Sequence, residues 1–304
     1  MYARELIVLG TASQVPTRYR NHNGYLLRWD DQGILFDPGE GTQRQMIYAG
    51  VTTAAISRIC ITHFHGDHCL GLAGIGQRIS LDRVSHTVPV HYPASGQVYY
   101  DRLRASSIFV DVASIQACPI AGGGVVAASE KWTLTALPLD HGVDTFGYRL
   151  QERDHRTLLP ERLAERGIVG PQIGELVRAG ELTVGGRTTH VAEVSVPRPG
   201  QSVAFVMDTR MCPNALTLAH GVDLLICEST YLHIDADKAL AHGHLTAVQA
   251  ATLAAEAGVR QLVLTHFSQR YPEVGPFLDE ACPIFPGTVA AADGDVIRVP
   301  ERGP

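Results

Sequence analysis

The chain has 304 residues, of which 45% are hydrophobic and 18% charged, a composition typical of a globular protein with a substantial buried core. No apolar run approaches the ~18 residues that a membrane-spanning helix needs, so an integral membrane protein is excluded. The net charge of −6 argues against binding nucleic acid by bulk attraction, but it leaves room for a local basic patch.

The N-terminal segment and the cysteines bear on the compartment. Glu5 interrupts the apolar part of residues 1–10, which predicts a first strand over residues 5–10 rather than a signal peptide. The six cysteines lie far apart and form no C-x-x-C pair, so we do not expect a disulfide framework. We therefore expect a cytoplasmic protein without a membrane segment.

After the first strand, short apolar strands alternate with helical stretches, which indicates an α/β fold. Further strands are predicted over residues 34–36, 56–62, 134–139, 203–207, 224–228 and 262–265. The clearest helix covers residues 246–257, because Thr246 and Gln249 form a capping box and Gly258 is a typical stop.

Residues 153–200 interrupt this strand rhythm. The segment is polar, rich in glycine and proline, and contains the pair Gly170 and Pro171. We expect an insertion that projects from a single domain spanning residues 1–304.

A dense group of histidines follows the third predicted strand, in the order His63, His65, Asp67, His68. Alternate residues of a strand point the same way, so His63 and His65 can reach one metal ion. A turn at Gly66 would carry Asp67 and His68 toward a second position. Isolated histidines are more often surface or core residues, but four such residues at these spacings rarely occur by chance. The segment therefore predicts a metal site, and its ligand types are those of catalytic zinc.

Three residues later in the chain also follow predicted strands. His141, Asp208 and His266 each come at or just after the C-terminal end of an apolar strand. Each would be a weak candidate alone, since such residues are more often surface polar groups. Their shared position favours all three as further ligands.

This order of ligands, with Asp37 upstream in the segment F-D-P-G-E-G, resembles the metallo-β-lactamase superfamily. The resemblance covers essentially the whole chain and implies an αββα sandwich with a projecting flexible arm. It also implies two Zn²⁺ per subunit at one edge of the paired sheets. The implied ligands are His63, His65 and His141 for one zinc, Asp67, His68 and His266 for the other, and Asp208 between them. Asp37 would hold the ligand loop by hydrogen bonds.

Several motifs narrow the resemblance to the ribonuclease Z family. Residues 16–21 (P-T-R-Y-R-N) are similar to its P-x-K-x-R-N loop, and residues 36–45 to its first motif. Residues 265–271 (T-H-F-S-Q-R-Y) resemble its last motif, and residues 243–247 (G-H-L-T-A) its G-H-S-T-A, with E-S-T upstream at 228–230. Gly170-Pro171 resembles the Gly-Pro motif of the family's tRNA-binding arm, here residues 153–200.

The resemblance implies a zinc-dependent endoribonuclease that cuts the 3′ trailer from precursor tRNA. The tRNA would keep a 3′ hydroxyl and the trailer a 5′ phosphate, and the enzyme would be a homodimer. Asp67 would accept the proton of the attacking water, and His244, held by Glu228, would protonate the leaving oxygen. The implied RNA-binding residues are Arg18, Arg20, Asn21, Gly170 and Pro171.

Some positions depart from the family pattern. Arg18 replaces a lysine, which fits a chain with 23 Arg and 2 Lys and keeps the charge. Met207 replaces a glycine before Asp208, and Leu245 replaces a serine after His244. Val177 stands at a position of the arm that is often basic, so the affinity of the arm for RNA is expected to be reduced.

Other functions and one interface remain open at this point. A small-molecule phosphodiesterase or arylsulfatase would use the same metals but neither the 16–21 loop nor the arm. A thioester hydrolase would leave Glu228 and His244 unexplained, and a non-catalytic RNA-binding metalloprotein would not need seven ligands. Residues 71–79, which are rich in small side chains, could form part of a dimer interface or a core helix beside the metal loop.

Overall fold

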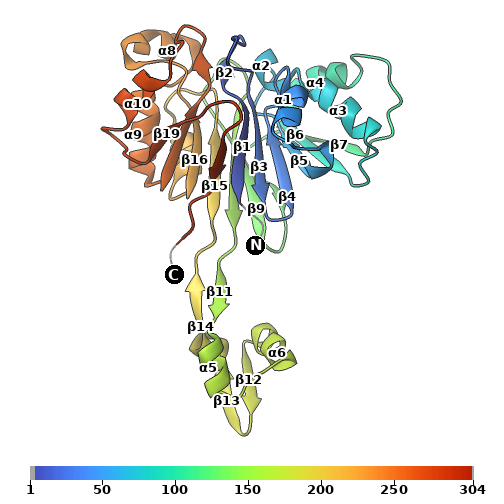
Figure 1. The fold of residues 1–304 in the computed structure, drawn as a ribbon, viewed down its shortest axis with the longest axis vertical. Coiled ribbons are helices and arrows are strands. Elements are labelled where there is room, and N and C mark those ends of the chain that lie inside the picture. The colour runs from blue at the N-terminus through green and yellow to red at the C-terminus, as the bar shows by residue number, and fades with distance from the viewer. Residues whose placement is uncertain (1–3, 303–304) are drawn as a thin grey trace.

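Two seven-stranded sheets stack face to face, and helices cover the outer face of each sheet (Figure 1). The computed structural model describes residues 4–302. The arrangement confirms the expected αββα sandwich. No helix within the described range is long and apolar enough to cross a membrane.

Apart from β20, which comes from the C-terminal end of the chain, the first sheet is built from the N-terminal part of the chain and the second from the remainder. In spatial order, the first sheet contains β20 (Val296–Arg298), β1 (Glu5–Gly10), β3 (Gly24–Trp29), β4 (Gln32–Phe36), β5 (Arg58–Cys60), β6 (Val88–Pro93) and β7 (Ile115–Ile120). The second sheet contains β19 (Thr288–Ala290), β17 (Gln261–Thr265), β16 (Leu224–Glu228), β15 (Ser202–Val206), β10 (Phe146–Glu152), β9 (Trp132–Pro138) and β8 (Gly124–Ala128). Two short strands outside these sheets, β2 (Ala12–Ser13) and β18 (Phe267–Ser268), pair with each other.

Helices follow the same division. The first sheet is accompanied by α1 (Thr42–Tyr48), α2 (Gly66–Cys69), α3 (Leu72–Leu81) and α4 (Gln97–Arg104), with 3₁₀ turns η1 (Thr53–Ala55) and η2 (Ala94–Gly96). The second sheet is accompanied by α7 (Pro213–Ala219), α8 (Ala236–His242), α9 (Ala247–Ala257) and α10 (Gly275–Ala281), with η4 (His233–Asp235).

The inner faces of the two sheets share one apolar core. Phe36 of β4 stacks on Phe205 of β15 with ring centroids 4.6 Å apart, and Tyr148 of β10 packs against the same group. Burying these large rings removes apolar surface from water, which stabilises the fold by about 25 cal/mol for each Å² buried. This shared core fixes the two sheets, and therefore the polar residues at their edges, relative to each other.

Helix α3 belongs to the core beneath the first sheet. Leu72, Ile75 and Ile79 are completely buried. A Cβ atom on Gly76 would lie 2.6 Å from Nη1 of Arg104, and one on Gly71 would lie 2.1 Å from the carbonyl oxygen of Gly39. The small residues of this segment are thus needed for close contacts within the chain.

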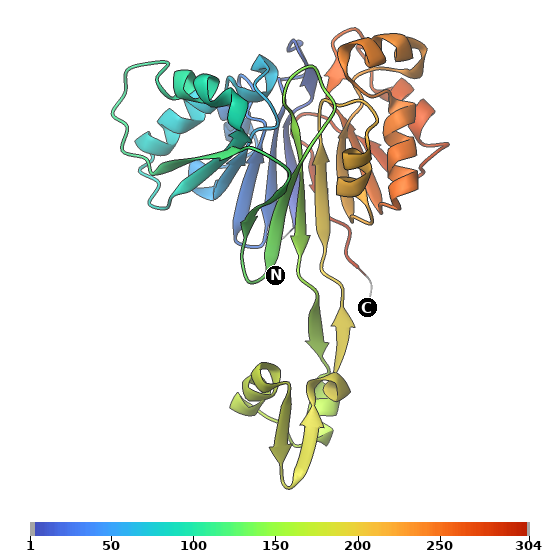
Figure 2. The same cartoon turned by 180° about the vertical axis from the view of Figure 1, so that it is seen from behind.

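Residues between β10 and β15 form the arm. It contains β11 (His155–Leu158), α5 (Pro160–Glu165), α6 (Pro171–Ala179), β12 (Glu181–Val184), β13 (Arg187–His190), η3 (Val191–Val194) and β14 (Ser195–Arg198). Seen from behind, β10 and β15 lead directly into β11 and β14, which pair as an antiparallel ribbon (Figure 2). The arm leaves the sandwich at the end opposite to α2 (Figure 1).

The arm has its own small core and a polar attachment to the sandwich. Its core cluster contains the buried side chains Leu163, Ile168, Leu176 and Val194. At its root, the guanidinium of Arg4 donates to both carboxylate oxygens of Glu152 at 2.6 and 2.7 Å and to Asp30 at 2.8 and 3.0 Å.

Most predicted strands are confirmed, with ends that shift by one or two residues. The largest difference is β5, which covers three residues instead of the seven predicted for 56–62. Ile56 ends the 3₁₀ turn η1, and the amide of Thr62 donates to the Asp37 side chain instead of a neighbouring strand. The capping box of Thr246 and Gln249 and the left-handed stop at Gly258 are confirmed at α9.

Candidate metal centre

Polar residues that follow strands of both sheets meet at one edge of the sandwich. β4 and β5 are parallel in the first sheet, and β15, β16 and β17 are parallel in the second, so their C-terminal ends point the same way. The chain turns sharply where it leaves three of these strands. Asp37, Asp208 and His266 have left-handed backbone angles, with φ of 42°, 43° and 60°.

The first group of ligand atoms contains His63, His65, His141 and Asp208. Nε2 of His63 lies 2.8 Å from Nδ1 of His65 and 3.5 Å from Oδ2 of Asp208. Nε2 of His141 lies 3.4 Å from Nδ1 of His65 and 3.7 Å from the same Asp208 oxygen. Ligands about 2.0–2.1 Å from one tetrahedral zinc are separated by about 3.3 Å, so this spacing suits zinc.

The second group contains Asp67, His68 and His266, and Asp208 borders it as well. Oδ2 of Asp67 lies 3.5 Å from Nε2 of both His68 and His266. Nε2 of His68 lies 3.3 Å from Oδ2 of Asp208, and Nε2 of His266 lies 3.3 Å from its Oδ1. Asp208 therefore faces both groups. His65 is exposed whereas the whole second group is buried, so the centre opens to solvent on the side of the first group.

Hydrogen bonds on the outer sides of the rings orient four of these histidines. Nδ1 of His68 donates to Asp37 at 2.8 Å, and Nδ1 of His141 donates to the Gly243 carbonyl at 2.9 Å. Nδ1 of His63 lies 3.0 Å from the hydroxyl of Thr62, and Nδ1 of His266 lies 2.8 Å from that of Thr230. Both hydroxyls donate to carboxylates, so each can accept from its histidine.

These outer bonds occupy one nitrogen of each of the four rings, so the inward nitrogen can supply its lone pair to a metal once it carries no proton. Nε2 of His266 and Oδ1 of Asp208 are buried without a hydrogen-bond partner among the described residues. A buried polar atom without a partner is costly, and metal ligation would satisfy both atoms. The donor set therefore fits two zinc ions.

The charge of the centre also favours cations. Burial by itself would lower the pKa of His68, but the carboxylates of Asp208, Asp67 and Asp37 hold that pKa well above its usual range. Burial would raise the pKa of Asp208, yet His266 and His68 hold it well below its usual range. Metal binding would replace the proton on His68 with a cation of higher charge.

Glu228 and His244 form a pair next to the ligands. Nδ1 of His244 lies 3.1 Å from both carboxylate oxygens of the completely buried Glu228. Although burial opposes it, the Glu228 carboxylate raises the pKa of His244 to about 9. His244 also lies close enough to Asp208 and His266 for a third group of possible ligands, so its role must be separated from ligation by experiment.

In the loop of residues 16–21, some side chains point into solvent and others toward the protein. Arg18 and Tyr19 are exposed. Arg20, predicted to contact RNA, is buried instead: its guanidinium donates to the carbonyl of Tyr271 and lies over the ring of Phe267. The side-chain amide of Asn21 donates to the backbone carbonyls of His22 and Glu40. Arg20 and Asn21 therefore hold the loop in place, while Arg18 is exposed on it, and contact of these three residues with RNA stays a prediction.

Gly170 and Pro171 lie in the arm, at the opposite end of the molecule from the edge of the sandwich where the two ligand groups meet, here called the metal edge (Figure 1). Gly170 precedes α6 with φ of 55°, and Pro171 is the first residue of that helix. A glycine is favoured there because a side chain would strain the backbone. Their contact with RNA remains a prediction.

Three positioning groups were not among the predicted site residues. Thr62 and Thr230 orient ligand histidines, and the backbone amide of Gln14 donates to Oδ2 of Asp67 at 2.7 Å. Both threonines lie beside predicted site residues. No side-chain pattern marks a backbone donor such as that of Gln14.

Comparisons with known proteins identify the family of the chain. The family described as Metallo-beta-lactamase superfamily matches residues 17–210, and the Beta-lactamase superfamily domain matches residues 172–267. The ribonuclease Z of Nocardia farcinica is 60% identical over 99% of this chain and 98% of its own length, and that of Salinispora arenicola is 56% identical over 96% and 95%. The crystal structure of human tRNase Z, short form, has a TM-score of 0.69 at 24% identity and covers 98% of this chain and 100% of its own.

Proposed function

The chain belongs to the ribonuclease Z family of the metallo-β-lactamase superfamily, tRNA 3′-processing endonucleases, and we propose that it removes the 3′ trailer of precursor tRNA at a two-zinc centre. One observation carries this proposal. Asp208 belongs to the first group of ligand atoms and lies 3.3 Å from two members of the second, and the Glu228–His244 pair lies directly beside both groups. A two-metal centre with an adjacent acid is suited to hydrolysis of a phosphodiester.

We assign His63, His65 and His141 to one zinc, Asp67, His68 and His266 to the other, and Asp208 to both. When bound, the two ions would supply a nucleophile from water near neutral pH and compensate the negative charge of the reacting phosphate. Asp37 would support this set by holding His68 and the Thr62 amide.

The chain's own residues move the protons. Asp67 belongs to the second group, and we assign to it the role of accepting the proton of the attacking water. His244 carries a proton that the Glu228 carboxylate stabilises, and it would donate this proton to the leaving 3′ oxygen of the tRNA. The tRNA then keeps a 3′ hydroxyl, and the trailer keeps the 5′ phosphate.

The arm would hold the body of the tRNA, away from the bond that is cut. Because the arm leaves the end of the sandwich opposite to α2, it cannot easily hold a tRNA whose 3′ end lies in its own metal centre. We therefore propose a homodimer in which the arm of one protomer holds the tRNA cut by its partner.

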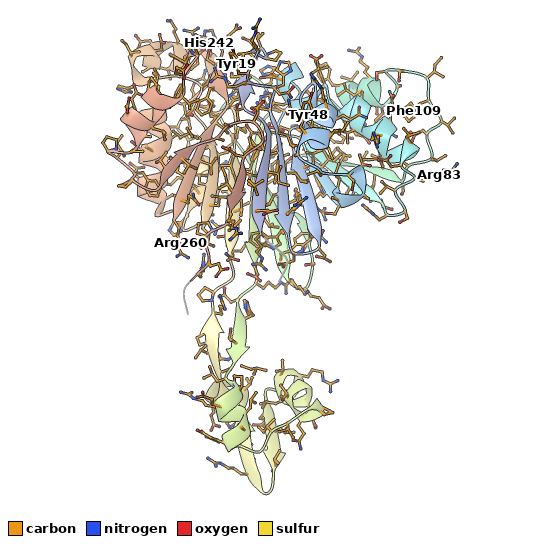
Figure 3. The ribbon with its side chains drawn as sticks, viewed as in Figure 1. Tyr19, Tyr48, Arg83, Phe109, His242 and Arg260 are labelled. Carbon is orange, nitrogen blue, oxygen red and sulfur yellow. The ribbon has the colours of Figure 1, made fainter. Side chains whose placement is uncertain are left out.

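The contact surface of this dimer would lie along the outer side of α3. Leu81, Ile108 and Val110 are 76%, 104% and 82% exposed. The segment that carries the last two residues is attached to α3 by hydrogen bonds from Ser80 to Asp111 and from Gln77 to Ser107. Phe109 and Arg83 mark the outer end of this surface (Figure 3).

We place the reaction in the cytoplasm. The six cysteines Cys60, Cys69, Cys118, Cys212, Cys227 and Cys282 are all free thiols. Unpaired cysteines are typical of proteins in a reducing compartment.

Metal analysis together with one cleavage assay tests the proposal. The purified protein should contain two zinc ions per chain and should release the trailer from precursor tRNA with the ends described above. A chelator should remove both the zinc and the activity. One zinc per chain, or a zinc-loaded protein that leaves precursor tRNA intact, would contradict the proposal.

A further inference from the structure

Tyr19 is an exposed aromatic residue without a structural role in the chain's own packing. Its side chain is 83% exposed. It lies at the same end of the molecule as α2, which carries Asp67 and His68 (Figures 1 and 3). An aromatic ring held in water at the rim of a site is a candidate for ligand contact.

The loop that carries Tyr19 is fixed before any ligand binds. The hydroxyl of Thr17 accepts hydrogen bonds from the amides of Tyr19 and Arg20 at 3.2 and 2.9 Å. The amide of Thr17 donates to the carbonyl of Arg20 at 2.8 Å, which closes the turn. Two further contacts attach the turn to the sandwich. The buried side chain of Arg20 donates to the Tyr271 carbonyl, and the backbone N–H of Asn21 donates to the Asp293 carboxylate at 2.6 Å. The backbone that carries the ring is thus ordered in advance, which lowers the cost of ordering the loop when a base stacks on Tyr19.

The same loop borders the metal centre. Two residues before it, the amide of Gln14 donates to Oδ2 of Asp67. The imidazole of His22, just after the loop, lies 3.2 Å from the carbonyl oxygen of Gln14. The loop on which Arg18 and Tyr19 are exposed is therefore anchored at both ends beside the metal centre.

We propose that Tyr19 stacks on one unpaired base of the precursor next to the scissile phosphate, while Arg18 contacts the adjacent backbone. Every base offers a π-face, so the contact would position the strand without reading its sequence. This inference rests on the proposed function, because the stacked base belongs to the RNA that the centre cuts.

The first test compares variants at two exposed tyrosines. Tyr19→Ala should lower kcat/KM for precursor tRNA by about 5- to 150-fold, the usual range for loss of one base–aromatic stack. Tyr19→Phe keeps the ring and should retain most of the rate. Tyr48→Ala is the matched control, since Tyr48 is 65% exposed on α1 and lies at a different place on the surface (Figure 3). An unchanged rate for Tyr19→Ala would overturn the proposal.

The second test identifies the base. Precursors with a single abasic nucleotide are made at each position within three nucleotides of the cleavage site. At the stacked position, the wild type should lose as much rate as Tyr19→Ala loses on the intact precursor, and the variant should lose nothing further. Fully additive losses at every position would show that Tyr19 contacts no base there, and would overturn the proposal.

A third readout does not depend on cleavage. 2-Aminopurine is placed at that position of the precursor. Its fluorescence should be quenched when the precursor binds a His244→Ala protein and should stay unquenched with the His244→Ala/Tyr19→Ala protein. Equal quenching by both proteins would contradict stacking. If the wild type fails to cut the intact precursor at all, the proposed function fails instead, and these outcomes are thereby distinguished.

Discussion

The metal edge and the arm are built in opposite ways. At the metal edge, both sheets contribute ligands, and buried carboxylates and hydroxyls orient four of the histidines. In the arm, a core of four buried side chains supports a surface of scattered charges. The first region depends on the whole sandwich being assembled, whereas the second depends mainly on its own few contacts.

Because the two regions are built separately, substitutions in each are expected to affect different properties of the enzyme. If the proposed roles hold, a substitution at the metal edge should alter the chemistry and leave RNA binding in place. A substitution in the arm should alter RNA binding and leave the chemistry in place. The following variants test this separation, beginning with the largest expected effect.

Asp67→Ala should abolish cleavage of precursor tRNA and leave tRNA binding largely intact. The variant removes both a zinc ligand and the assigned proton acceptor, whereas Arg18 and the arm remain. Single-turnover cleavage and a gel-shift titration measure the two properties, with Asp101→Ala on α4 as the control. Turnover at the wild-type rate would refute the proposed metal chemistry.

His244→Ala should lower turnover by about 10²–10⁴-fold, the usual contribution of a positioned proton donor. Its zinc content should equal that of the wild type, since His244 is not assigned as a ligand. His242→Ala is a suitable control, because His242 is exposed at the end of α8 at the same end of the molecule (Figure 3). Unchanged turnover with less zinc would make His244 a structural ligand.

Removing the arm should lower kcat/KM for precursor tRNA by at least about tenfold, a loss of roughly 1.4 kcal/mol of binding. The variant replaces residues 156–197 with a short turn, because β11 and β14 pair across that position. Hydrolysis of bis(p-nitrophenyl) phosphate should not change. An equal loss on both substrates would show that the arm supports the metal edge itself.

Mixing the arm-deleted protein with Asp67→Ala protein tests the dimer. The Asp67→Ala protein is inactive and the arm-deleted protein is weakened, but a hybrid dimer has an intact arm opposite an intact centre. Cleavage should rise above that of the arm-deleted protein alone when the subunits exchange. If sedimentation shows exchanged dimers while the rate stays at that of the arm-deleted protein, the arm acts within its own subunit.

Leu176→Ala should destabilise the arm by about 2–5 kcal/mol, since Leu176 is completely buried in the arm's small core. Hydrogen exchange should rise in residues 155–198 alone. The neighbouring Val177→Ala, at a 53% exposed position, should change little. Faster exchange at β15–β17 would mean that the two regions are not independent.

Glu228→Gln should produce the smallest change, a shift in pH dependence. The Glu228 carboxylate raises the pKa of His244, so the donor keeps its proton until the pH rises through that pKa. Loss of the carboxylate lowers the pKa, and the alkaline limb of the kcat profile should move to lower pH. An unmoved limb would mean that another group controls it.

The spacing of His63, His65, Asp67 and His68 is rare by chance, so the sequence marked as candidates residues that the structure brings together at the metal edge. Their ligation of zinc stays a prediction. The direction in which Arg20 points could not be predicted, because a charged residue in a loop motif carries no sign of it. Its burial beside Phe267 depends on contacts with residues about 250 positions away, which one sequence does not display.

The left-handed backbone at Asp37, Asp208 and His266 has an evolutionary consequence. Such conformations in residues other than glycine cost about 1–3 kcal/mol each. Glycine would relieve the strain at each position but would remove a ligand or the group that holds one. Selection for heat resistance alone would therefore favour inactive chains here. Any thermostable descendant must gain its extra stability elsewhere, and the small independent core of the arm is one place where a stabilising change leaves the metal edge untouched.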